Sequence, residues 1–300
     1  MKHMYDSLEK IIEISTNDNL GFWRVIQADD CRERGIPEEE SWNQMLNMYR
    51  EMKEADLSYD AKLHSMSGLV GSEGEKMKNA RKNKTVLCGD FIGKVMEKSL
   101  KMGESNACMR RIVAAPTAGS CGVVPAVFLS IAEEKYYPEE KMIKALYVAG
   151  GIGGVIANRA FIAGAAGGCQ AEIGTASAMA AGGVTYLMGG DARAIANAVA
   201  LTLKNFMGLV CDPVAGLVEV PCVKRNVIGA VNALVTADET MAGIYSKIPP
   251  DEVIDAMRAV GRSMPENLKE TGTGGIAATP TGIRISEDLN DSQEDLREIV

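Results

Sequence analysis

Apolar side chains recur at helical spacing in the segment that follows Pro37. Three glutamates come directly after this proline, and this order suits the first turn of a helix because carboxylates favour its positive end. The apolar residues then fall three or four positions apart, at Trp42, Met45, Leu46, Tyr49 and Met52. The pattern predicts an amphipathic helix from Pro37 to about Tyr59.

Three later segments open with comparable signals, either a proline before two acidic residues or an aspartate that can cap a helix. The expected helices begin at Pro138, at Asp191 with an end near Phe206, and at Pro250 with an end near Met264. Alternating strand patterns are scarce in the second half, which is expected to be all-α. The first 130 residues leave room for a few short strands.

The stretch from Ala145 to Gly190 consists almost wholly of small and aliphatic residues. Glycines recur in it at Gly150, Gly154, Gly164 and Gly168, and polar residues interrupt it at Asn158, Arg159, Gln170 and Glu172. Those interruptions, and the weak contribution of Ala and Gly to membrane insertion, argue against a membrane span. Small residues let helix backbones approach closely, so Gly/Ala-rich central helices in a buried core are expected.

Composition and charge narrow the classes of protein. With 300 residues and 46% hydrophobic content, the chain can bury a large core. Its formal net charge of −8 argues against nucleic acid and anionic membranes as partners. The opening MKHMYDSLEK lacks the features of a secretory signal, so a cytoplasmic location is expected. A catalytic domain at 1–285 and a solvated acidic tail at 286–300 are predicted.

Several common kinds of site are excluded by the motifs. The glycines of 150–154 do not match the dinucleotide fingerprint, and the phosphate-binding G-x-x-x-x-G-K-[ST] motif does not occur. His3 and His64 are the only histidines, which excludes a multi-histidine metal site. The seven cysteines are an odd number without an export signal, which argues against a disulfide framework. Any protein-rich metal site would have to use cysteine.

Three cysteines lie at predicted breaks in structure: Cys169, Cys211 and Cys222. Cys169 follows two glycines and Cys222 follows a proline, so each is expected to begin a helix and to face its positive end. Buried packing is the competing interpretation for any cysteine. It is favoured for the other four, at Cys31, Cys88, Cys108 and Cys121.

The strings around these cysteines resemble the α subunit, or α domain, of bacterial iron–sulfur-dependent L-serine dehydratases. The matching strings are GCQAE, CDPVAGLVEVPC and KRN around the cysteines, SMSGLVG from Ser65, APTAGS from Ala115 and TGGIAATPT from Thr273. The likeness runs from near the N-terminus to about Ile285. It implies an all-α catalytic domain, and the fold class predicted for the whole chain is therefore all-α.

The resemblance also implies a reaction and a site. Members convert L-serine to pyruvate and ammonia with a [4Fe–4S] cluster, and Cys169, Cys211 and Cys222 match the cluster ligands. Three thiolates leave one iron open as a Lewis acid for the substrate hydroxyl. Substrate binding is predicted at two loops, by Ser65, Ser67 and Gly68 and by Thr117, Ala118, Gly119 and Ser120. The catalytic base is either His64 or a histidine of a separate β subunit, which the two-chain type of the family implies.

The sequence also bears on self-blocking of the cluster, on the partner of Arg159 and on three alternative functions. Some single-chain relatives end in a cysteine that closes the cluster, whereas this chain ends Arg297-Glu298-Ile299-Val300, so that self-blocking is not expected here. Arg159 is expected to pair with a substrate carboxylate or with Glu172. The alternative functions are a cluster-dependent L-cysteine desulfidase, a pyridoxal-phosphate dehydratase, and a helical scaffold or membrane-associated protein whose cysteines only pack.

Overall fold

The structure, a computed structural model, describes residues 4–298, and side chains up to residue 291. Its α-helices are α1 Leu8–Asn17, α2 Phe22–Arg34, α3 Glu38–Leu57, α4 Glu73–Lys82, α5 Gly89–Ala107, α6 Val124–Lys135, α7 Glu139–Arg159, α8 Gly164–Gly167, α9 Cys169–Leu187, α10 Ala192–Phe206, α11 Cys222–Met241, α12 Pro250–Ser263 and α13 Pro280–Glu298. Short 3₁₀ turns are η1 Val214–Gly216, η2 Glu266–Leu268 and η3 Gly275–Ala278.

The all-α class is confirmed. Within residues 4–298 no strand forms, so the short strands considered before residue 130 are not found there. The backbone pairs at two isolated bridges instead, His64 with Gly71 and Cys211 with Lys269. The second bridge brings a cysteine segment against the C-terminal part of the chain.

The four helices predicted from start signals are confirmed as α3, α7, α10 and α12. Pro37 and Pro138 precede their helices in the extended conformation, so each helix begins at the first glutamate after its proline. Asp191 caps α10 by accepting a hydrogen bond from the Ala194 N–H at 2.8 Å. Capping and acidic first turns therefore located these helix starts.

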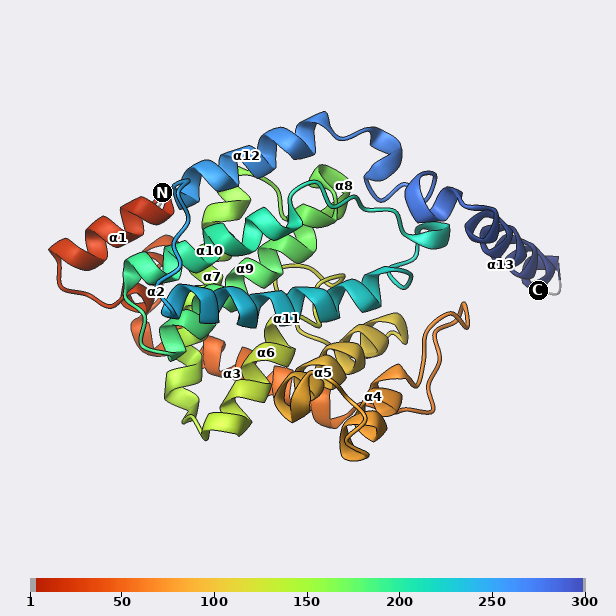
Figure 1. The fold of residues 1–300 in the computed structure, drawn as a ribbon, viewed down its shortest axis with the longest axis horizontal. Coiled ribbons are helices and arrows are strands. Elements are labelled where there is room, and N and C mark those ends of the chain that lie inside the picture. Colours follow the sequence, from red (N-terminus) through yellow and green to blue (C-terminus); the bar gives the residue numbers. More distant parts are fainter. Residues whose placement is uncertain (1–3, 299–300) are drawn as a thin grey trace.

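Helix α9 occupies the centre of the molecule. It packs against α7, α10 and α11, and Figure 1 shows α12 and α5 lying outside these helices on opposite sides. Every residue of α9 except Tyr186 is buried. The small-residue stretch thus forms the central helix of a protein core, as predicted. Among the described residues, no helix is long and apolar enough to cross a membrane.

Within α7, the close approach to neighbouring helices uses a different glycine from the two that the sequence spacing suggested there. Gly150 and Gly154 of α7 face open space, with no heavy atom within 4 Å of an added Cβ. On an adjacent face of α7, Gly153 approaches Met179 of α9 so closely that an added Cβ would lie 2.9 Å from the sulfur. The three-or-four spacing identified a helix but not which of its faces is buried.

Gly183 of α9 provides a direct test of this packing. A Cβ at Gly183 would overlap the buried ring of Phe128 and lie 3.2 Å from the Ala145 carbonyl oxygen. We expect Gly183→Ala to destabilise the protein by about 1–3 kcal/mol through overpacking. Gly150→Ala is the matched control, and it should stabilise by roughly 0.5–1 kcal/mol through helix propensity. Urea unfolding of both variants checks this, and equal effects would contradict the packing.

Helix α13 extends away from the rest of the molecule at the C-terminal end in Figure 1. It begins at Pro280 and runs to Glu298, so the boundary predicted between residues 285 and 286 falls inside a helix. The division into a catalytic domain at 1–285 and an acidic tail remains a prediction. Ile299 and Val300 lie outside the described residues.

Candidate metal and substrate site

Two of the three predicted cysteines are the first residues of helices, as expected. Cys169 begins α9 and Cys222 begins α11. Gly168, just before Cys169, has a φ of 77°, and an added Cβ would lie 2.6 Å from the Met264 sulfur. This turn therefore requires glycine. Both thiols lie at the positive ends of long helices, which favour anions.

Cys211 is held by backbone pairing rather than by a helix. Its N–H donates to the Leu268 carbonyl at 2.8 Å, and the Glu270 N–H donates to the Cys211 carbonyl at 2.7 Å. Its sulfur lies against Gly164, where an added Cβ would come within 2.7 Å. The C-terminal segment therefore fixes the position of this thiol.

The three thiols share one buried region. Each cysteine is at most 5% exposed. Burial raises the pKa of the Cys169 thiol to about 12, and burial together with the neighbouring Cys169 raises the pKa of the Cys222 thiol to about 12. Burial also raises the pKa of Cys211, with added contributions from Cys169 and Cys222. Thiols this strongly desolvated need nearby positive charge to ionise.

The three cysteines supply donors of the kind that iron–sulfur clusters use. Among the side chains described up to residue 291, no group of three His, Cys, Asp or Glu is arranged to hold a single metal ion. Thiolates are the ligands of iron–sulfur clusters, and a cluster spans more space than one ion. Three buried, free thiols from three separate segments are compatible with that larger group.

Arg225 links the segments that carry Cys169 and Cys211. Its guanidinium donates hydrogen bonds to the Cys169 sulfur and, at 2.8 Å, to the Val210 carbonyl. It also forms a 2.8 Å ion pair with the buried Asp212. Asp212 in turn accepts from the Ile276 N–H at 2.8 Å. This arginine supplies positive charge beside a candidate ligand.

The predicted substrate loop that starts at Thr117 lies against the start of α11. Asn226 donates to the Gly119 carbonyl at 2.7 Å and to the Cys222 carbonyl at 2.9 Å, and accepts from the Gly122 N–H at 2.9 Å. Within the described chain, the consecutive N–H groups of Ala118, Gly119 and Ser120 donate to no acceptor. Consecutive free amides form a concavity that suits an anion such as a carboxylate.

Glu172 lies beneath the same loop. Thr117 Oγ1 donates to Glu172 Oε1 at 2.5 Å, and a Cβ added at Gly119 would meet that oxygen at 2.5 Å. Burial raises the pKa of this carboxyl; the Thr117 hydrogen bond lowers it, and Glu270 raises it. Glu172 also raises the pKa of all three cysteines, so it belongs to the same region.

The second predicted loop, Ser65 to Gly71, is tied to the segment between Cys211 and Cys222. The hydroxyls of Ser65 and Ser67 both donate to the buried Glu219 carboxylate, at 2.9 and 2.5 Å. These hydroxyls are therefore already engaged by the protein. Gly68 turns the loop with a φ of 74°, and its N–H donates to the Ser65 carbonyl at 2.9 Å.

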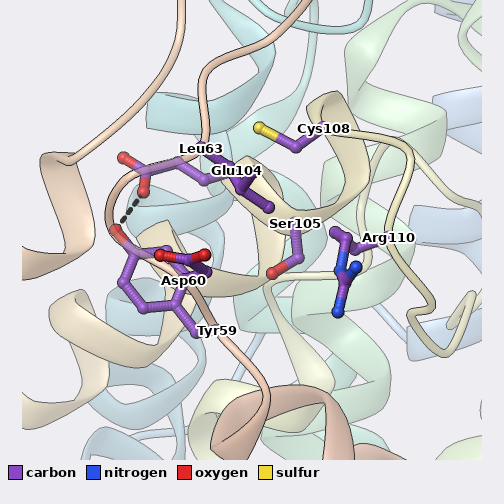
Figure 2. Close-up of a pocket in the computed structure, with 7 residues that line it drawn as sticks. All are labelled: Tyr59, Asp60, Leu63, Glu104, Ser105, Cys108 and Arg110. Atoms are coloured by element: carbon purple, nitrogen blue, oxygen red, sulfur yellow. Dashed lines mark hydrogen bonds between the residues drawn. The ribbon is translucent and has the colours of Figure 1, made fainter.

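His64 is exposed, and its Nδ1 lies 3.2 Å from the Lys62 carbonyl oxygen. Its assignment as the base remains a prediction. A small pocket lined by the preceding residue, Leu63, has a volume of about 10 Å³, enough for about one water, and His64 does not line it. Figure 2 shows its lining residues: Tyr59, Asp60, Leu63, Glu104, Ser105, Cys108 and Arg110. Tyr59 donates a hydrogen bond to Glu104 there, so two of the polar lining groups already bind each other.

Arg159 does not pair with Glu172, one of its two expected partners, and its pairing with a substrate carboxylate stays a prediction. It ends α7 and pairs with Asp255 of α12 at 2.6 Å. Arg159 Nε also lies 3.9 Å from Oδ1 of Asp251 in the same helix. Glu172 has no ion pair among the described residues. No sequence pattern singled out Arg225, Asn226 or Glu219 as functional, although all three lie in the matching strings.

Together these features define an all-α protein with a buried three-thiol region and two polar loops beside it. Residues 17–277 match the family described as "Serine dehydratase alpha chain". The chain is 44% identical over 286 residues, 95% of each chain, to the probable L-serine dehydratase, alpha chain, of Bacillus subtilis.

It is 50% identical over 196 residues, 65% of this chain and 94% of the relative, to the probable L-serine dehydratase, alpha chain, of Latilactobacillus sakei. It is also 32% identical over 285 residues to the L-serine dehydratase of Helicobacter pylori J99, covering 92% of this chain but 62% of that one. The chain belongs to the serine dehydratase alpha chain family, and the resemblance seen in its motifs is confirmed.

Proposed function

We propose that this chain is the α subunit of an L-serine dehydratase, an ammonia-lyase that converts L-serine to pyruvate and ammonia. The family membership and the names of the relatives support the reaction. The observation that most supports the chemistry is the burial of Cys169, Cys211 and Cys222 in one region, two of them at helix N-termini.

In this proposal Cys169, Cys211 and Cys222 would hold a [4Fe–4S] cluster. When bound, such a cluster would supply a Lewis acid that stabilises negative charge on the departing substrate oxygen. The helix N-termini and Arg225 offset the negative charge of the thiolates. Burial of all three sulfurs excludes water, which strengthens these interactions.

The free N–H groups of Ala118, Gly119 and Ser120 would bind the substrate carboxylate. The Ser65–Gly71 loop, which contains the other predicted residues Ser65, Ser67 and Gly68, would border the site through its bonds to Glu219, which lies between Cys211 and Cys222 in the sequence. His64 and a partner histidine remain the base candidates from the sequence.

The proposal predicts brown protein after anaerobic purification, with about four irons per chain and matching acid-labile sulfide. It also predicts pyruvate formation from L-serine by that protein. L-Cysteine is assayed in parallel, because sulfide release from it would favour the desulfidase alternative. Colourless protein that is fully active would contradict the cluster. An absorbance near 410 nm that shifts with borohydride would favour pyridoxal phosphate instead.

A separate β subunit is the proposed partner. The matched relatives include two called alpha chains, and the longer Helicobacter pylori relative extends beyond the region that this chain covers. We expect the iron-loaded chain alone to turn over serine at least about tenfold more slowly than the chain mixed with a β subunit, a loss of roughly 1.4 kcal/mol in transition-state stabilisation. Equal rates with and without the β subunit would contradict this partnership.

A further inference from the structure

Glu172 is a buried carboxylate for which the fold provides no cation. It is 7% exposed, and within the described residues no lysine, arginine or histidine forms an ion pair with it. Glu97, which is 5% exposed, shows the usual arrangement, since it pairs with Arg81 at 3.0 Å and with Lys101 at 2.7 Å. Among the described residues, the Glu172 carboxylate accepts a hydrogen bond only from the Thr117 hydroxyl.

A purely structural role does not explain a carboxylate at this position. Burying an unpaired charge costs free energy, and a neutral glutamine could accept the same Thr117 hydrogen bond without that cost. Burial raises the pKa of Glu172, which makes its carboxylate a better proton acceptor once it is ionised. The arrangement is thus unfavourable for stability but suited to proton transfer.

The position of Glu172 also matches the geometry of an amino acid held at the Thr117 loop. The α-carbon of an amino acid is bonded directly to its carboxylate carbon. A substrate whose carboxylate binds the amides of Ala118 to Ser120 therefore places its α-carbon two covalent bonds beyond the bound oxygens, beside that loop. The Glu172 carboxylate lies directly against Gly119, at the centre of the loop.

We propose that Glu172 is the base that removes the α-proton of the amino acid substrate; this inference rests on the proposed function. The α C–H bond breaks, and its proton passes to a carboxylate oxygen of Glu172. The electron pair forms the Cα–Cβ double bond, and the β C–O bond breaks as hydroxide leaves. The hydroxide combines with the proton on Glu172 to form the released water. The remaining organic product is aminoacrylate. Water then hydrolyses its imine tautomer to pyruvate and ammonia.

The test compares Glu172→Gln and Glu172→Asp with the wild type, all in the iron-loaded protein with its β subunit. We expect the glutamine variant to lose at least about 100-fold in kcat with little change in KM, since general-base catalysis contributes on the order of 10²–10⁴-fold. Glu172→Asp should recover part of the rate. In both variants the kinetic isotope effect on kcat with 2-deuterated L-serine should be larger than in the wild type, because proton removal becomes slower relative to the other steps.

Iron content and thermal unfolding provide readouts that do not depend on activity. Glu172→Gln should keep its iron and unfold at the same or a higher temperature, because an unpaired buried charge is removed. Glu97→Gln is the matched control, and it should unfold at a lower temperature while keeping the wild-type kcat, since it breaks ion pairs outside the site.

Several results would overturn the inference. Loss of iron in both Glu172 variants would show a structural role. Wild-type kcat in Glu172→Gln, together with a large loss in His64→Gln, would assign the base to His64. If the wild type fills with iron but forms no pyruvate, the proposed function fails and this inference fails with it. An active wild type with an equally active Glu172→Gln overturns the inference alone.

Discussion

Replacing Cys169, Cys211 or Cys222 by serine is expected to abolish iron binding and serine dehydration. Hard oxygen is a poor substitute for soft thiolate on iron, so each replacement should remove or destabilise the whole cluster. Iron per chain and pyruvate formation are measured for each single variant after anaerobic purification. Retention of both in any one of the three variants would show that its cysteine is not a ligand.

The remaining cysteines are the controls for that experiment. Cys88 is exposed, and Cys31 and Cys108 are partly buried. Their serine variants should cost only packing, roughly 0.5–3 kcal/mol, and keep their iron. Cys121 is buried beside Ser120, and its sulfur donates to the Met102 carbonyl at 3.5 Å. Cys121→Ser should therefore disturb the Thr117 loop without removing iron. Iron loss in these variants would point to a different ligand set.

Arg225→Ala is expected to have the second largest effect. It leaves Asp212, which is 3% exposed, as a buried charge that keeps only the Ile276 N–H, and this should destabilise the protein by about 3–5 kcal/mol. The hydrogen bond to the Cys169 sulfur is lost at the same time, so iron should be released more easily. Urea unfolding and the rate of iron loss to a chelator measure the two effects.

Two further arginine variants separate charge from geometry. Arg225→Lys keeps the charge but cannot span Val210, Asp212 and Cys169 with one planar group, so an intermediate loss is expected. Arg159→Ala breaks an ion pair with Asp255, whose side chain is 45% exposed, and should cost less than about 1 kcal/mol without iron loss. Equal effects at the two arginines would refute the role given to Arg225.

Local chemistry predicted much of the fold. Proline, acidic first turns and the Asp191 cap located the starts of α3, α7, α10 and α12 because these signals act within one helical turn. The starts of α9 and α11 at Cys169 and Cys222 followed from the residues just before them. The buried face of α7 could not be predicted, since it depends on which helices lie beside it.

Only the parts of the candidate site that lie within one short sequence motif could be predicted from the sequence. The two loops and the three cysteines were identified from motifs, but the bonds that join them span large separations in sequence. Glu219 holds Ser65 across 154 positions, and Asn226 holds Gly119 across 107. No local pattern encodes such pairings. Arg159 illustrates the same limit, because its partner on α12 could be recognised only from the folded chain.

The pairing of Cys211 with the Leu268–Glu270 segment has a consequence for how the protein is made. A ribosome releases the three cysteines well before this segment, and at about 5–20 residues per second the interval lasts on the order of several seconds. During that time Cys211 lacks its backbone partners, and Gly168 lacks the Met264 side chain that packs against it. The three thiols are therefore more accessible in the newly synthesised chain than in the folded protein, until the Leu268–Glu270 segment has folded into place.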